Sequence, residues 1–114
     1  IDHTLMKLQL KPGEKLLDIG SGWGWLIIRA ARQYGVKATG ITVSKEQHDR
    51  TQQRIKELEL GHLVDVLLMD YRELTATGNK FDKVCLFIWR LSEICSRLEG
   101  CHFCILLPIQ LRAL

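Results

Sequence analysis

Asp18-Ile19-Gly20-Ser21-Gly22-Trp23-Gly24 is the stretch that decides the fold of this chain. An apolar run typical of a buried strand precedes it, at 15–20, and a helical pattern of apolar residues follows it, at 24–34. Its three glycines let the backbone turn tightly and approach a ligand, and the start of the following helix offers free N–H groups. The stretch therefore predicts a nucleotide-binding turn.

The spacing of the glycines separates two kinds of nucleotide. Dinucleotide-binding turns have the pattern G-x-G-x-x-G, with an acidic residue about 20 positions later that holds a ribose. Here the pattern is G-x-G-x-G, because position 25 is Trp, and an acid, Asp18, precedes the turn. This arrangement favours S-adenosylmethionine (SAM), and a nicotinamide-dependent oxidoreductase is the less favoured alternative.

Strand and helix patterns alternate along the first 84 residues. The stretch 37–43 predicts a second strand, and Ser44 can cap a helix that runs to about Leu60, with Gln47 reaching back to the cap. Further strands are predicted at 64–69 and from 81 onward, separated by a polar loop at 75–80. This alternation indicates an α/β, Rossmann-like fold with a mostly parallel sheet and helices on both faces.

The polar residues of interest follow three of these strands. Residues 18–24 follow the first strand, residues 42–47 the second and residues 70–72 the third. The carboxyl ends of parallel strands meet at one edge of a sheet, and ligands bind there, near the point where the strand order reverses. The three segments therefore predict a single site.

Length and composition limit the range of functions. A chain of 114 residues holds one domain, and a doubly wound unit of this length is truncated or minimal. The net charge of +3 comes from scattered basic residues, so we expect no nucleic-acid partner. No run reaches the roughly 18 apolar residues of a membrane span. The first four residues lack the pattern of a signal peptide, and because the chain begins with Ile1 we expect a fragment.

The cysteines are confined to residues 85–114. Cys101 and Cys104 have the C-x-x-C spacing of some metal and redox sites. Their neighbours at 103–107 are typical of a buried strand, on which positions three apart face opposite sides and cannot bind one ion. We therefore expect no metal site and a cytoplasmic protein with reduced, structural cysteines.

Two stretches of the chain resemble one family. Residues 16–25 include the turn sequence G-W-G-W, and residues 40–47 have the sequence G-I-T-V-S-K-E-Q. Together they resemble the cyclopropane fatty acid synthases, including the mycolic acid cyclopropane synthases, which are class I SAM-dependent methyltransferases. The resemblance covers about residues 5–84, so we expect residues 1–84 to form the N-terminal half of a SAM-binding core.

The resemblance implies which residues bind SAM. Gly20 and Gly22 would pass the backbone under the methionine part of the cofactor, with Asp18 positioning the loop and the ligand amine. Residues 42–47 would surround the ribose, and residues 70–71 would lie beside the adenine, where an aromatic ring can stack. The implied set is Asp18, Gly20, Ser21, Gly22, Gly24, Thr42, Val43, Gln47, Asp70 and Tyr71.

The resemblance also implies a reaction and a location. A methyl group would pass from SAM to a cis double bond in an acyl chain of a phospholipid, followed by proton loss and ring closure. The substrate implies a cytoplasmic protein in peripheral contact with the inner face of the membrane. A non-catalytic SAM-binding or interaction module is the alternative.

The catalytic residues cannot be assigned from this sequence. The family uses a bound bicarbonate as base, held by a Glu-His pair soon after the fourth strand, whereas residues 85–91 here are C-L-F-I-W-R-L. We favour a change of reading frame or of sequence source near residue 85. The alternative is a shortened connection, with a helix at 92–98 and a fifth strand at 101–107. In both cases residues 85–114 form a divergent C-terminal segment.

Overall fold

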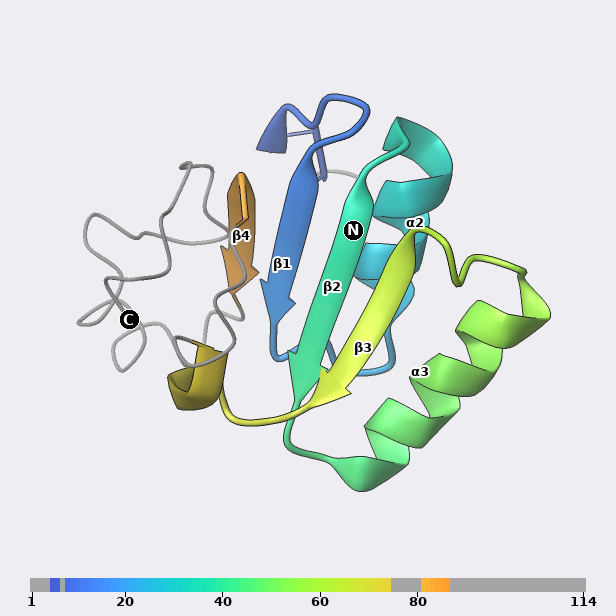
Figure 1. The fold of residues 1–114 in the computed structure, drawn as a ribbon, viewed down its shortest axis with the longest axis vertical. Helices are drawn as coiled ribbons and strands as arrows, with labels where there is room; N and C mark the ends of the chain where they lie inside the picture. Colours follow the sequence, from blue (N-terminus) through green and yellow to red (C-terminus); the bar gives the residue numbers. More distant parts are fainter. Residues whose placement is uncertain (1–4, 7, 75–80, 87–114) are drawn as a thin grey trace.

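A single parallel sheet organises the chain. The computed structural model describes residues 5–6, 8–74 and 81–86 (Figure 1). The sheet has the strand order β3-β2-β1-β4, and two α-helices and one 3-10 helix connect the strands. The elements are β1 (Lys15–Ile19), α2 (Trp25–Tyr34), β2 (Lys37–Thr42), α3 (Lys45–Glu57), β3 (Val64–Leu68), η1 (Tyr71–Glu73) and β4 (Lys83–Leu86).

The strand order reverses beside β1. The chain moves outward from β1 to β2 and then β3, and β4 is added on the other side of β1. Both neighbours pair with β1 in the parallel sense, so the prediction of a parallel Rossmann-like sheet is confirmed. A ligand site is expected beyond the carboxyl ends of the strands at such a reversal.

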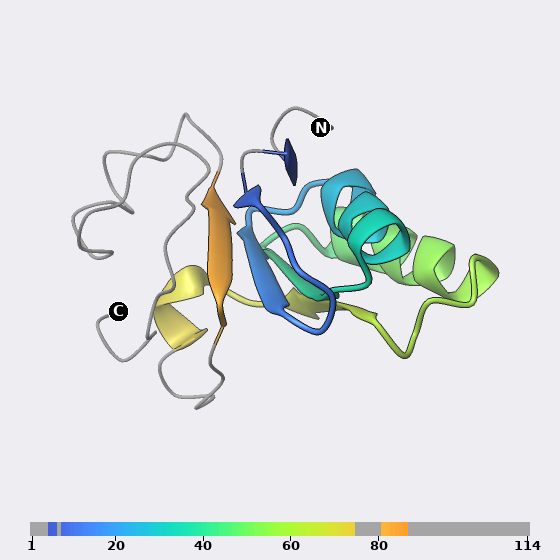
Figure 2. The ribbon, with the colours of Figure 1, turned by 90° about the horizontal axis from the view of Figure 1, so that it is seen from above.

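Both described α-helices cover the same face of the sheet (Figure 2). Side chains from both helices and from the facing strand positions form one buried apolar cluster, which includes Leu16, Ile27, Ala30, Ile55 and Val66. A right-handed connection places both helices on one side because β1, β2 and β3 follow one another in the same direction. The predicted helical layer on the opposite face lies outside the described residues and stays a prediction.

Glycines mark both ends of α2. Gly24 at the N-cap and Gly35 at the C-cap have left-handed φ values of 84° and 68°. Residues with a Cβ rarely adopt this conformation, whereas glycine adopts it readily. The Gly35 N–H donates to the Ala31 carbonyl at 3.1 Å, which closes the last turn. The helix predicted over 24–34 is therefore confirmed to within one residue.

The start of α3 differs from the predicted capping pattern. Ser44 is the N-cap, and its hydroxyl accepts from the Gln47 N–H at 3.3 Å, as expected. The prediction that the Gln47 side chain reaches back to the cap is wrong. Gln47 Oε1 accepts from the Thr42 hydroxyl instead, and the Ser44 N–H donates to the same hydroxyl. The helix ends at Glu57 and not near Leu60, since Glu59 has a left-handed φ of 56°.

β4 joins the sheet through a reciprocal contact with the start of β1. The Lys15 N–H donates to Asp82 Oδ2, and the Asp82 N–H donates to the Lys15 carbonyl, both at 2.8 Å. Cys85 in β4 is buried and forms no disulfide, in agreement with the prediction of a reduced, structural cysteine. The other cysteines, the loop predicted at 75–80 and the elements predicted at 92–98 and 101–107 lie outside the described residues.

Candidate functional site

Backbone hydrogen bonds hold the glycine-rich loop after β1 against the end of β2. The N–H groups of Gly20 and Ser21 both donate to the Ile41 carbonyl at 2.9 Å, and the Gly24 N–H donates to the Ser21 carbonyl at 3.0 Å. Gly20 and Gly22 have left-handed φ values of 77° and 57°, which favour glycine at both positions. These hydrogen bonds and the two left-handed glycines define the course of the loop backbone.

Several N–H groups of this loop are left for a ligand. Within the described part of the chain, the N–H groups of Gly22 and Trp23 have no hydrogen-bond acceptor. The first backbone bond into α2 runs from Ile28 to Gly24, and Gly24 has no side chain to cap the earlier turn. Because the start of a helix also carries partial positive charge, this corner of the site suits an anionic group such as a carboxylate.

The loop packs against a backbone that lacks a side chain. A Cβ placed on Gly40 of β2 would lie 2.6 Å from Ser21 Cβ, 2.7 Å from Ser21 Oγ and 2.9 Å from Ile27 Cδ1. The Ser21 hydroxyl is buried and has no hydrogen-bond partner among the residues that the structure describes. These contacts make Ser21 a residue that shapes the loop, and its direct contact with a ligand stays a prediction.

Asp18 is buried at the carboxyl end of the central strand. Only 3% of its surface is exposed, and its register partners are Gly40 on one side and Cys85 on the other. It shares a strand face with Leu16, which packs in the cluster under α2. The partial positive charge at the start of α2 is favourable for a carboxylate at this edge of the sheet.

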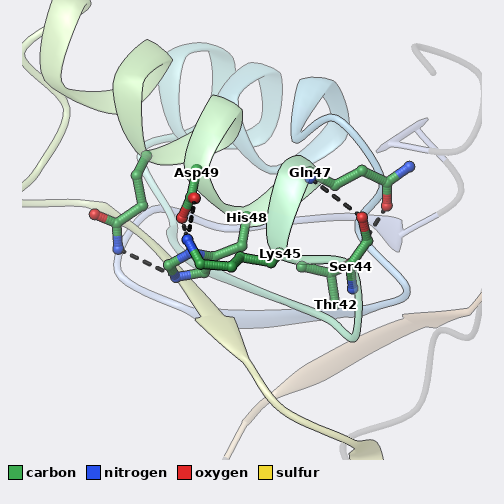
Figure 3. Close-up of polar contacts among 7 residues, drawn as sticks. Thr42, Ser44, Lys45, Gln47, His48 and Asp49 are labelled. Atoms are coloured by element: carbon green, nitrogen blue, oxygen red, sulfur yellow. Dashed lines mark hydrogen bonds and ion pairs between the residues drawn. The ribbon is translucent and has the colours of Figure 1, made fainter.

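The segment after β2 forms a closed network of hydrogen bonds (Figure 3). The Thr42 hydroxyl donates to Gln47 Oε1 at 3.3 Å and accepts from the Ser44 N–H at 3.1 Å, and the Gln47 N–H donates to Ser44 Oγ. The Gln47 amide nitrogen points away from Thr42 in Figure 3. Val43, between them in the chain, is 57% exposed. A ligand that takes the hydrogen bond donated by the Thr42 hydroxyl replaces its bond to Gln47 Oε1, whereas the Gln47 amide nitrogen is not engaged in this network.

An ion pair occupies the segment after β3. Arg72 donates from Nε to Asp70 Oδ1 at 3.0 Å and from Nη2 to Asp70 Oδ2 at 2.7 Å, while the Arg72 N–H donates to Oδ1 at 2.9 Å. Tyr71 between them is buried. A ligand that uses the Asp70 carboxylate would share it with Arg72, and the predicted stacking on Tyr71 stays a prediction.

Exposed apolar side chains accompany the polar ones at this edge. Trp23 after β1 is 42% exposed, and Leu68 at the end of β3 is 47% exposed, next to Thr42 in the strand register. Single exposed apolar residues are common on protein surfaces, so these two do not by themselves identify a binding surface. The set of cofactor-binding residues implied by the resemblance includes neither residue, although Trp23 lies in the predicted loop 18–24 and Leu68 ends β3.

The clearest electrostatic perturbation lies away from this edge, on the outer side of α3. The Asp49 carboxylate accepts from Lys45 Nζ at 2.6 Å and lies 3.0 Å from His48 Nδ1 (Figure 3). The hydrogen bond from Lys45, followed by that from His48, lowers the pKa of Asp49 below 3.8.

In the portion of the chain that the structure describes, no cluster of three or more metal-ligating side chains forms and no helix could cross a membrane.

Sequence comparison gives relatives for most of this chain. The model of a family described as mycolic acid cyclopropane synthetase matches residues 1–88. A probable fatty acid methyltransferase of Pseudomonas putida is 49% identical over 83 residues, which are 73% of this chain and 21% of that protein. The cyclopropane-fatty-acyl-phospholipid synthase of Escherichia coli K12 is 45% identical over 78 residues, 68% of this chain and 19% of that protein. The chain thus spans about a fifth of the length of these relatives.

Solved structures share the fold. The cyclopropane synthase MmaA2 from Mycobacterium tuberculosis has a TM-score of 0.73 and 32% identity, over 84% of this chain and 35% of that one. The mycolic acid cyclopropane synthase CmaA1, in complex with SAH and CTAB, has a TM-score of 0.71 and 31% identity, over 83% and 35%. An RNA methyltransferase from Salinibacter ruber, in complex with S-adenosyl-L-homocysteine, has a TM-score of 0.71 and 26% identity, over 82% and 63%. These likenesses confirm a partial class I methyltransferase fold.

Proposed function

The chain belongs to the mycolic acid cyclopropane synthetase family, and from this premise we propose that it is the SAM-binding portion of a cyclopropane-fatty-acyl-phospholipid synthase-like methyltransferase. The proposed enzyme transfers a methyl or methylene group from SAM to an unsaturated acyl chain of a phospholipid. Its substrate requires peripheral contact with a membrane, on the cytoplasmic side. The chain's share in this reaction is to bind and orient the methyl donor.

One observation carries the proposal: backbone hydrogen bonds hold the glycine-rich loop beside the reversal of strand order, and two of its N–H groups have no acceptor among the described residues. The unused N–H groups of Gly22 and Trp23, with those at the start of α2, suit the carboxylate of the methionine part of SAM. The buried carboxylate of Asp18 suits its ammonium group. Gly20 and Gly22 carry no side chain, so a ligand can approach the loop backbone closely at these positions.

The segments after β2 and β3 suit the nucleoside part of SAM. The Thr42 hydroxyl and the Gln47 amide are hydrogen-bonding groups of the kind that ribose hydroxyls recognise. The exposed side chain of Val43 offers apolar contact beside them. Asp70 and Tyr71 follow β3 at the same edge, where we propose that they lie beside the adenine.

Bound SAM would supply an electrophilic methyl carbon, because its sulfonium charge withdraws electrons from that carbon. The residues of this chain would hold that carbon in line with the double bond, and such positioning is a large part of catalysis in group transfer. The Glu-His pair and bicarbonate that the resemblance implies have no counterpart in residues 85–91. We therefore assign no catalytic residue, and this difference favours a non-catalytic SAM-binding module as the second candidate.

Calorimetric titration of the chain with SAM, SAH and NADH tests the cofactor. We expect SAM and SAH to bind and NADH not to bind, because the loop has the G-x-G-x-G spacing and Thr42 stands where a dinucleotide site has an acid. Binding of NADH without binding of SAM would overturn the proposal in favour of an oxidoreductase.

A transfer assay separates the two SAM-binding candidates. The chain is incubated with methyl-labelled SAM and vesicles of a phospholipid with cis-monounsaturated chains, and vesicles with saturated chains are the control. Label in the unsaturated lipid alone supports the methyltransferase. SAM binding without any transfer of label supports the non-catalytic module.

A further inference from the structure

One arginine of α3 contacts the glycine-rich loop from outside the candidate site. Arg54 Nη1 donates to the Trp23 carbonyl at 2.7 Å, and the guanidinium carbon lies 4.1 Å from the centroid of the Trp25 ring. Trp23 and Trp25 flank Gly24, the N-cap of α2. A single side chain therefore holds the junction between loop and helix on both sides.

The geometry of the peptide bond gives this contact its effect. Because a trans peptide is planar, the Trp23 carbonyl and the Gly24 N–H point in opposite directions. Arg54 binds the carbonyl on one side, and the Ser21 carbonyl accepts the N–H at 3.0 Å on the other. These two bonds fix the plane of the Trp23–Gly24 peptide, and with it the turn that leaves the Gly22 N–H available to a ligand.

A second contact one turn earlier in α3 supports the same junction. Thr51 is fully buried, and its methyl carbon Cγ2 lies 2.4 Å from where a Cβ on Gly24 would be. Thr51 and Arg54 are three residues apart and so lie on the same face of the helix. The backbone of the loop thus lies directly against α3 at Gly24.

This face of α3 also begins at the ribose side of the candidate site. Gln47, in the first turn, binds the Thr42 hydroxyl, and Thr51 and Arg54 follow at four and seven positions. Residues at this spacing line one side of a helix. One rigid helix therefore aligns the segment after β2 with the loop after β1.

We propose that Arg54 is a positioning residue for SAM, which acts by fixing the Trp23–Gly24 peptide from α3. This inference rests on the proposed function. Arg54 is not one of the hydrogen-bond donors that contact the cofactor. Without it the Trp23–Gly24 peptide can rotate, so part of the binding free energy is spent on ordering the loop. Preorganisation of this kind strengthens binding without adding a contact. A planar guanidinium can donate to the carbonyl and stack on the ring together, which a lysine ammonium cannot do.

The test compares Arg54→Met with Arg50→Met in the full chain. Arg50 lies one turn away on α3, lines the same groove of about 900 Å³ between α2 and α3, and donates to Gln53 and not to the loop. The two variants lose the same charge from the same helix. SAH affinity is measured by calorimetry, and hydrogen exchange of the Gly24 N–H is measured by NMR without ligand.

We expect R54M to lower SAH affinity and Gly24 N–H protection by about tenfold each, and R50M to change both by less than about twofold. R54K, which keeps charge and stem, should fall between them and replaces R54M if that variant does not fold. Equal affinity and equal Gly24 protection in the Arg54 and Arg50 variants would overturn the inference. Failure of the unsubstituted chain to bind SAH would overturn the proposed function, whereas the exchange of Gly24 still tests the role of Arg54 in the loop.

Discussion

The segments that follow β1 and β2 lie at the same edge of the sheet, but they differ in how many of their polar groups already have hydrogen-bond partners. After β1, backbone bonds to Ile41 and Ser21 fix the loop, and the N–H groups of Gly22 and Trp23 have no acceptor among the described residues. After β2, the polar groups of Thr42, Ser44 and Gln47 already bind one another.

The difference decides what binding requires of each segment. A ligand group that meets the loop after β1 gains hydrogen bonds without displacing any protein contact. A ligand group that meets Thr42 exchanges one hydrogen bond for another, so its net gain is small. We therefore expect the first segment to contribute most of the affinity and the second to contribute mainly to discrimination between ligands.

We expect the largest loss of stability from a substitution at Gly24, in the loop after β1. The change Gly24→Ala places a Cβ at φ 84° and 2.4 Å from the Thr51 methyl carbon. Left-handed strain and overpacking together should lower the free energy of unfolding by about 3 kcal/mol, measured by urea denaturation. Gly13→Ala is the matched control, because Gly13 has φ 86° and no atom within 4 Å of the added Cβ. Equal losses in the two variants would show that the contact with α3 is unimportant.

A smaller loss is expected at Gly40, where the loop rests on β2. Gly40→Ala introduces a Cβ 2.6 Å from Ser21 Cβ without a left-handed φ, so crowding alone acts. We expect a loss of about 2 kcal/mol in unfolding free energy and weaker SAM binding. Gly61→Ala, with nothing within 4 Å, is the control and should change little. The double variant with Ser21→Gly should recover part of the loss, and no recovery would contradict the assigned contact.

Removing a hydroxyl should have opposite effects at two threonines. Thr42→Val removes a hydroxyl that both donates and accepts, which leaves the Ser44 N–H without that acceptor, and should destabilise the chain by about 1 kcal/mol. Thr51→Val removes a buried hydroxyl that has no partner in the described part of the chain, and should be neutral or stabilising. Thermal unfolding of the two variants shows whether each substitution raises or lowers the stability of the chain. Equal destabilisation would contradict the contrast between paired and unpaired groups.

The smallest effect concerns pH and the outer side of α3. Because the pKa of Asp49 is lowered in the folded chain, its stabilisation is present above pH 3.8 and is lost as the pH falls through the lower folded value. The contribution is small because the carboxylate is exposed. NMR titration should show that Lys45→Met raises the pKa of Asp49 toward 3.8, since Lys45 is the main cause. Lys56→Met, on the same helix, should leave it unchanged, and an equal shift in both variants would rule out a local cause.

The sequence was sufficient where local chemistry decides the structure. Gly24 and Gly35 delimit α2, and the alternation of strands and helices predicted the parallel sheet with its three convergent segments. These features depend on backbone preferences and on periodic burial, which neighbouring residues express directly.

The sequence did not predict the contacts between residues that are far apart in the chain. Arg54 contacts a carbonyl 31 positions away, and no local pattern marks a surface arginine for such a contact. The Gln47 side chain binds the Thr42 hydroxyl and not the Ser44 N–H, because that hydroxyl lies within reach once the strand meets the helix. The register of β2 beside β1, which brings Gly40 under Ser21, is likewise a property of the assembled sheet.

The position of β4 beside β1 also sets an order of assembly. β1, β2 and β3 follow one another within residues 15–68, whereas the reciprocal bonds between Lys15 and Asp82 close a span of 67 residues. During synthesis, one edge of the central strand therefore stays open until β4 emerges from the ribosome. An open edge of this kind invites pairing with other chains, so the interval before β4 docks is the period in which a nascent chain most needs protection from aggregation.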